Sequence, residues 1–254
     1  MRRAAVAVTA AGAVLLLLWS VGARTEDEPT PVPTASGDAA TTANATALLR
    51  SGTEFIDRTS FRVDSDIASQ VTARIHTDVV HKRAVAVLSA ANGVIEIRMI
   101  DTELYMTSTL DPAGVGRGWM RLDPVRVPSD FAPSFAAGRN DPGGSARLID
   151  AVVSAQADGS HITGTLDVNR IGIGIGLSFR PGPGGSFPES ARSHAFHASL
   201  DAEGRLVSFL MPAADGLPNA SLRYSDFGVS LEVIRPEGAV AAPDALYPQL
   251  GVGG

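Results

Sequence analysis

A histidine pair and an acidic pair are the side chains whose types and spacing could support chemistry in this sequence. His194 and His197 are three residues apart, so they could share a metal ion on a helix but point to opposite faces of a strand. Asp101 and Glu103 would share one strand face and suit general acid–base catalysis. They also lie in an expected hairpin turn, where acidic residues are common. We therefore expect no metal site and no catalytic residue.

The glycine pattern and the serines do not form a known catalytic or cofactor motif. The run 171–176 alternates Ile and Gly, but its third glycine comes one residue early for a dinucleotide-binding loop. No Gly-x-Ser-x-Gly nucleophile elbow is present. These glycines are better explained by a bent strand or a close approach of two backbones. We expect no cofactor and no enzymatic activity. A secreted hydrolase stays an alternative if a histidine converges with a serine or a carboxylate.

The composition excludes several classes of protein. The chain of 254 residues has no Cys, which rules out disulfides and thiolate metal sites. Its net charge is -6 and its aromatic content is 6%, so we expect no nucleic-acid partner. The 26 Gly and 16 Pro are too many for a helical bundle and favour a fold with many short turns.

The first 23 residues have the pattern of an export signal. Arg2 and Arg3 precede an apolar run over 4–19, and Val21 and Ala23 are the small residues expected before a cleavage site. The run is short for a membrane-spanning helix, and an uncleaved anchor is the alternative. Val21-Gly22-Ala23 also precedes the lipidated Cys in bacterial lipoproteins, but the next residue here is Arg24. We expect an exported chain, secreted or at the extracytoplasmic face of the membrane, without a thioether-linked lipid.

Three segments follow the signal. Residues 24–45 are rich in Pro, Thr and Ala and are expected to form a disordered linker. Residues 46–242 carry the regular apolar patterns of one domain, and residues 243–254 are expected to form an irregular tail.

The apolar spacing of the domain changes between helix and strand periods. A helix capped by Thr46 is expected to carry apolar residues as far as Ile56, and a second helix is expected over 145–156. Alternating patterns predict short strands from Phe61 to Met106, with a hairpin at Asn92-Gly93. Further strands are expected at 161–168, 193–200, 205–211, 221–224 and 229–234. The predicted fold class is α+β, with a large curved antiparallel sheet of roughly ten strands and a few helices covering its concave face.

The apolar positions of these strands define a candidate ligand-binding face. If the helices cover the concave face incompletely, an apolar cavity suited to acyl chains remains. The alternative is that the helices fill the hollow, which is then only a core. The candidate cavity-lining residues are Val85, Val87, Ile95, Ile97, Met99, Met106, Leu166, Val168, Val207, Phe209, Leu222 and Leu231.

Several short motifs, in order, resemble a known family. Glu103-Leu-Tyr-Met106 is followed by Gly118-Trp-Met-Arg-Leu-Asp-Pro124, and later come His161-Ile-Thr-Gly-Thr-Leu-Asp167, Leu200-Asp-Ala-Glu-Gly-Arg-Leu206 and Tyr224-Ser-Asp-Phe-Gly228. This order, over about 46–236, resembles exported bacterial lipoproteins of the LppX–LprAFG type, which share a LolA-like half-barrel. Arg24 departs from the family pattern, which has a lipidated Cys at that position.

The resemblance implies a function without catalysis or a cofactor. Such proteins bind lipid acyl chains or lipoglycans in a hydrophobic cavity and carry them through the cell envelope, close to the membrane. The departure at Arg24 bears on membrane anchoring and leaves the cavity unaffected. The alternative is an envelope scaffold or sensor of the same fold that binds a protein partner.

Overall fold

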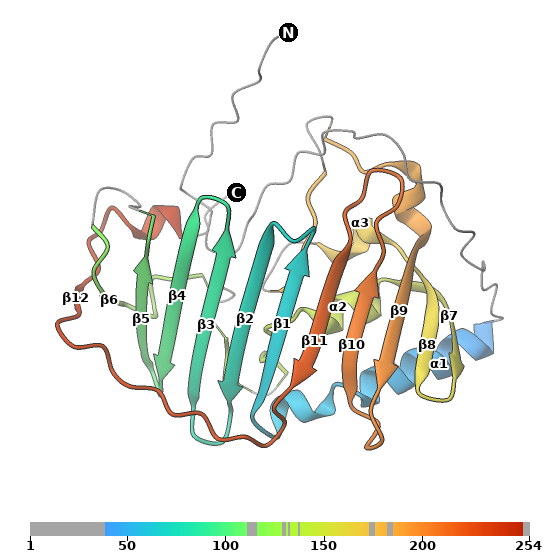
Figure 1. Cartoon of the computed structure of the whole chain (residues 1–254), viewed down its shortest axis with the longest axis horizontal. Coiled ribbons are helices and arrows are strands. Elements are labelled where there is room, and N and C mark those ends of the chain that lie inside the picture. The colour runs from blue at the N-terminus through green and yellow to red at the C-terminus, as the bar shows by residue number, and fades with distance from the viewer. Residues whose placement is uncertain are drawn as a thin grey trace, which may run out of the picture.

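One wide β-sheet organises the chain (Figure 1). The computed structural model describes residues 39–110, 116–128, 131, 133–136, 138–172, 176–181 and 185–250. The expected signal over 1–23, the linker as far as residue 38, residues 173–175 of the Ile-Gly run and residues 251–254 lie outside these ranges. No helix within the described ranges is long and apolar enough to cross a membrane.

Twelve strands of the described chain form the sheet, in the order β12-β6-β5-β4-β3-β2-β1-β11-β10-β9-β8-β7. All described neighbours pair antiparallel except β12 and β6, which are parallel. The α+β class with a large, open, mostly antiparallel sheet is therefore confirmed. The strands are β1 (Phe61–Ile67), β2 (Val71–Asp78), β3 (Arg83–Ala90), β4 (Gly93–Ile100), β5 (Glu103–Ser108), β6 (Met120–Leu122), β7 (Val152–Asp158), β8 (His161–Leu166), β9 (His194–Leu200), β10 (Leu206–Met211), β11 (Ala220–Ser225) and β12 (Val240–Ala241).

The α-helices gather on one half of the sheet. Figure 1 shows α1, α2 and α3 behind the half that contains β7 to β11, and α1 packs against β7. The α-helices are α1 (Ala39–Ser51), α2 (Ser145–Asp150) and α3 (Val168–Ile171), and the 3-10 helices are η1 (Glu54–Asp57), η3 (Glu189–Ser193) and η4 (Tyr247–Gln249).

The first helix differs from its predicted limits at both ends. It begins at Ala39 rather than Thr46, so residues 39–45 of the expected linker are helical. Thr42 explains part of this early start, because its Oγ1 accepts a hydrogen bond from the backbone N–H of Ala155, 3.2 Å away, on β7. The helix ends at Ser51, and the next carbonyl, that of Gly52, accepts a hydrogen bond from the Leu206 N–H at 2.8 Å.

The second predicted helix is shorter than expected because its C-terminal half is a strand. Helix α2 ends at Asp150, and Val152 begins β7, where its β-branched side chain suits an extended backbone. The N-terminus of α2 is fixed by Asp141, whose carboxylate accepts hydrogen bonds from the N–H groups of Ser145 and Ala146 at 3.0 and 2.7 Å.

The second set of predicted strands is correct for β9 to β11, too long for β8 and wrong for the segment 229–234. Strand β8 ends at Leu166, because Asp167 caps the short helix α3 and accepts a hydrogen bond from the Asn169 N–H at 3.0 Å. The segment 229–234 is not a strand. It belongs to residues 226–239, here called the strap, which runs along the strand ends from β11 to β12 (Figure 1).

The strap is held by polar contacts to the strand ends that it crosses. Arg98 on β4 donates to the carbonyl of Ile234 at 3.0 Å, and Arg235 pairs with Glu103 at the start of β5. Asp78 at the end of β2 accepts from the N–H groups of His81 and Leu231 at 3.0 and 3.3 Å. These contacts bind the strap to the strand ends and satisfy the backbone N–H of Leu231 and the carbonyl of Ile234 without a strand partner.

The described part of the expected irregular tail is packed against the body. Leu246 is fully buried, and Tyr247 and Leu250 are also buried in the main hydrophobic cluster. The hydroxyl of Tyr247 accepts a hydrogen bond from the N–H of Asp123 at 2.9 Å, and the guanidinium of Arg126 lies 3.8 Å from its ring centre. Residues 243–250 therefore cover part of the domain.

The buried carboxylate of Asp78 makes the strap sensitive to pH. Its side chain is 2% exposed. Burial acts to raise its pKa, but the hydrogen bonds from the His81 backbone and side chain and from Leu231 outweigh burial and lower the pKa below the ordinary carboxyl value. As the pH falls, Asp78 is therefore protonated in the unfolded chain before it is protonated in the folded protein. The contribution of the Asp78 carboxylate to folding stability is present at neutral pH and is lost as the pH falls through its folded-state pKa.

We predict that Asp78→Ala destabilises the protein by about 1–3 kcal/mol at neutral pH, because two backbone donors lose their buried acceptor. Urea unfolding measured at neutral and acidic pH should show this difference shrinking once the wild-type carboxylate is protonated. Glu232→Ala, an exposed acidic position on the strap, is the control and should leave stability nearly unchanged. Equal stability of wild type and Asp78→Ala at neutral pH would contradict the prediction.

Candidate functional site

The pairing register places an unbroken apolar row on one face of the sheet, here called the inner face. Directly opposed partners point to the same side, so the row can be followed from strand to strand. All its members are at most 4% exposed. From β11 to β6 the row is Tyr224, Val63, Ile75, Ala86, Ile97, Met106 and Met120.

Most predicted cavity residues on β4 to β11 lie on this inner face. Met99 is half-buried and packs against the hydrophobic cluster. The others are at most 6% exposed and belong to the same cluster: Ile95, Ile97, Met106, Leu166, Phe209 and Leu222.

The two valines of β3 were assigned to the wrong face. Val85 lies opposite Arg98 and Val87 opposite Glu96, so both valines point to the outer, polar face. The inner positions of β3 include Ala84 and Ala86, which are 1% and 3% exposed, and the partly buried Leu88. Strand β3 alternates Ala with Val, and both are apolar, so the pattern does not distinguish its two faces. The larger valines were therefore wrongly assigned to the buried face. The face is fixed by pairing of Ala86 with Ile75 and Ile97, the bulky inner residues of β2 and β4.

Three other candidates do not lie on regular inner-face positions. Val168 is buried but belongs to α3 rather than to a strand. Val207 lies at a register shift between Leu206 and Ser208 and is half-buried. Leu231 lies on the strap, where its N–H contacts Asp78.

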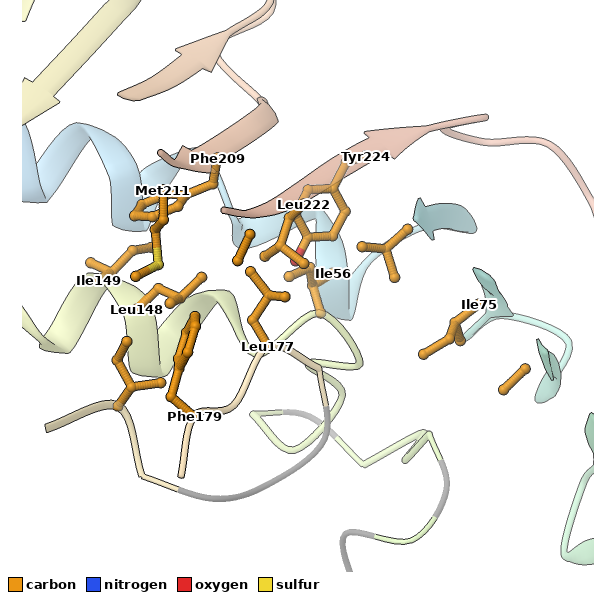
Figure 2. Packing of buried hydrophobic residues seen from close by; sticks show 14 of the residues in the cluster. Ile56, Ile75, Leu148, Ile149, Leu177, Phe179, Phe209, Met211, Leu222 and Tyr224 are labelled. Carbon is orange, nitrogen blue, oxygen red and sulfur yellow. The ribbon is translucent and has the colours of Figure 1, made fainter. Parts of the chain in front are cut away.

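Under β10, β11 and β1 the inner face is covered by α2 and the segment around Leu177 (Figure 2). Leu148 and Ile149 of α2, which are at most 1% exposed, point toward Phe209 and Met211 of the sheet. Sequence reasoning placed the two α2 residues on one apolar face, but it did not identify Leu177 and Phe179, because no periodic pattern surrounds them. Their packing closes this half of the sheet.

Close backbone contact holds this cover in place. The N–H of Leu177 donates to the carbonyl of Gly143 at 3.0 Å. A Cβ on Gly176, which has φ +80, would lie 2.0 Å from that carbonyl oxygen. The glycine at the end of the Ile-Gly run therefore permits a close approach of two backbones, as expected from the sequence. On the sheet side, a Cβ on Gly143 would lie 2.4 Å from the hydroxyl of Tyr224.

The histidines do not converge on a metal ion. His194 is buried on the inner face and His197 is exposed on the outer face, as predicted for a strand. Burial, the largest effect, lowers the pKa of His194 and favours its neutral form. The described residues contain no group of three or more His, Cys, Asp or Glu side chains that could hold a metal ion.

Two histidines have polar partners relevant to the hydrolase hypothesis. His81 Nδ1 lies 2.8 Å from Asp78 Oδ2, but that carboxylate is buried and also binds backbone N–H groups. His161 Nδ1 lies 3.3 Å from Ser199 Oγ on the exposed outer face, and no carboxylate hydrogen-bonds this imidazole within the described ranges. Neither pair assembles a nucleophile, a base and an orienting acid.

We predict that Gly143→Ala destabilises the protein by about 1–3 kcal/mol, because the new methyl group collides with Tyr224 beneath the sheet. Adding Tyr224→Phe removes the colliding hydroxyl and should restore part of the loss in a double-mutant cycle measured by chemical denaturation. Strictly additive effects would show that the two residues do not contact each other in solution.

Comparisons with known proteins identify similarity at the level of structure. No protein-family model and no curated protein matches the chain. Among solved structures, the chain is similar to the crystal structure of the Mycobacterium tuberculosis lipoprotein LppX, with 13% sequence identity and a TM-score of 0.42. The similarity covers 76% of this chain and 99% of the LppX chain.

Proposed function

We propose that this protein is an exported, non-catalytic lipid-binding protein of the bacterial cell envelope, and that acyl chains or the lipid part of a lipoglycan lie against the inner face of β3 to β6. Residues 1–23 serve as the export signal in this proposal. Arg24 replaces the lipidated Cys, so the protein acts close to the membrane without a thioether-linked anchor.

The observation that carries the proposal is the uneven cover of the inner face. The described α-helices lie behind the other half of the sheet (Figure 1). The inner face of the β3–β6 half combines small and flexible side chains with branched ones such as Leu88, Ile97 and Leu104. Ala84 and Ala86 leave little side-chain volume on the first half of β3, and three methionines follow on β4, β5 and β6. Methionine is unbranched and adapts to irregular apolar partners. Burying an acyl chain here would contribute about 0.8 kcal/mol for each methylene.

One observation favours the scaffold or sensor alternative. The inner side chains of this half are already nearly inaccessible to water, since Ile97 and Met106 are each 1% exposed. If this burial comes only from the protein's own side chains, the hollow is filled and the fold presents its outer surface to a protein partner. The two functions therefore differ in whether extra volume can be added beside Ala86.

Native lipid content gives the direct test of the proposed function. We predict that protein purified from its bacterial host, extracted with organic solvent and analysed by mass spectrometry, carries acyl lipids at a substantial fraction of the molar amount of protein. Empty protein that also fails to bind a fluorescent fatty acid would overturn the proposal.

A pair of adjacent substitutions separates a lipid site from a solid core. We predict that Ala86→Phe retains the stability of the lipid-free protein but lowers fatty-acid binding at least about tenfold, because the ring occupies the acyl-chain site. Val85→Phe, one residue away on the outer face, is the matched control and should bind normally. If Ala86→Phe instead destabilises the protein by about 1–3 kcal/mol, the interior is already full and the alternative is favoured.

A further inference from the structure

The outer face of the sheet carries a polar groove that the proposed lipid site does not use. The groove has a volume of about 450 Å³ and lies over β1, β2, β3 and β11. It is hollowed where short hydroxyl side chains lie between longer charged ones. Its polar lining includes Asp64, Asp66, Thr72, Arg74, Ser221 and Arg223.

The pairing register arranges these side chains in two complementary rows. Asp64 of β1 lies between Arg74 of β2 and Arg223 of β11. One step along the strands, Asp66 lies between Thr72 and Ser221. Across the strands, each carboxylate of β1 therefore lies between a residue of β2 and a residue of β11 that can donate to it.

The charged groups differ in how far the protein itself satisfies them. The two carboxylate oxygens of Asp64 accept hydrogen bonds from Arg62 Nε and Arg74 Nε at 2.7 and 2.8 Å. Burial acts to raise the pKa of Asp64, but these bonds outweigh it and lower the pKa, so the carboxylate stays ionised. The guanidinium of Arg223 is exposed and has no hydrogen-bond or ion-pair partner among the described residues. It is available to a ligand. Asp66 accepts one hydrogen bond, from the Ser69 N–H at 2.8 Å, and keeps its other carboxylate oxygen for a ligand.

The mixture of charges discriminates between classes of ligand. Because Asp64 and Arg74 neutralise each other, the charges left for a ligand are Arg223 and Asp66. An anion bound at Arg223 would lie beside the Asp66 carboxylate, and a cation bound at Asp66 would lie beside the Arg223 guanidinium. A neutral polyol avoids both penalties, because each of its hydroxyls can donate to a carboxylate and accept from a guanidinium or hydroxyl. The volume of the groove lies within the usual range of small-molecule sites.

We propose that this groove binds a neutral carbohydrate of one or two sugar rings, with Arg223 and Asp66 as its main donor and acceptor. The site lies on the face of the sheet opposite the inner face. The carbohydrate proposal can therefore be tested independently of the lipid-binding proposal.

The test is an NMR titration of the full soluble chain, labelled with ¹⁵N, against maltose, cellobiose and mannobiose, with inorganic phosphate alongside. At least one disaccharide is expected to shift amide resonances of β1, β2, β3 and β11 with millimolar affinity. Arg223→Ala should weaken this binding about tenfold, and Ser221→Trp, which fills the groove, should abolish it. Arg121→Ala removes an exposed arginine from the same face outside the groove and should leave binding unchanged.

Two outcomes would overturn the carbohydrate assignment. The first is the absence of any localised shift with all three disaccharides. The second is a response to inorganic phosphate alone that Arg223→Ala removes, which would identify an anion site. Lipid extraction on the same samples reports separately on the inner face, so failure of one proposal does not mask the other.

Discussion

The structure depends on keeping the apolar side chains of many paired strands on one side of a single sheet. A one-residue slip at any pairing would move a whole strand's apolar set into water. The row from Tyr224 to Met120 shows that the register avoids this slip across seven neighbouring strands. The polar partners that alternate with this row, such as Asp64, Arg74 and Glu96, then fall on the other side by necessity. One constraint thus creates both the buried face and the charged face.

Sequence reasoning identified the class of the fold and most strands, because alternation of apolar and polar residues is a local signal. It assigned the wrong face to β3, where both alternating residues are apolar and only the neighbouring strands decide. It extended the helix at 145–156 into β7, and it interpreted the strap segment 229–234 as a strand. These errors arise from contacts with distant residues, such as Asp78 with Leu231. No local sequence pattern indicates such contacts. The packing of Leu177 against the inner face could not be predicted for the same reason.

The two halves of the inner face differ in how they are closed. Beneath β10 and β11 the cover is built from α2 and close glycine contacts, where little rearrangement can occur without collision. Toward β6 the closing elements of the described chain include the C-terminal residues around Tyr247, which is held by Arg126 and Asp123. Such surface contacts exchange more readily with water than a packed interior does. The half proposed to receive lipid is therefore closed in part by the C-terminal segment, which combines buried apolar side chains such as Leu246 and Leu250 with polar contacts near the surface.

An open sheet has two outermost strands whose unpaired backbone groups invite pairing with another molecule. One of them is β7, which lies against α1. The backbone N–H of Ala155 on β7 donates a hydrogen bond to the Thr42 hydroxyl of that helix. The other outermost strand is β12, which extends over only Val240 and Ala241 and continues into the packed C-terminal segment. Within the described residues, one outermost strand thus lies against a helix and the other has only two residues. Neither offers another chain a long row of free backbone groups for pairing. For a sheet this wide, that arrangement lowers the risk of fibril-like stacking when many copies accumulate.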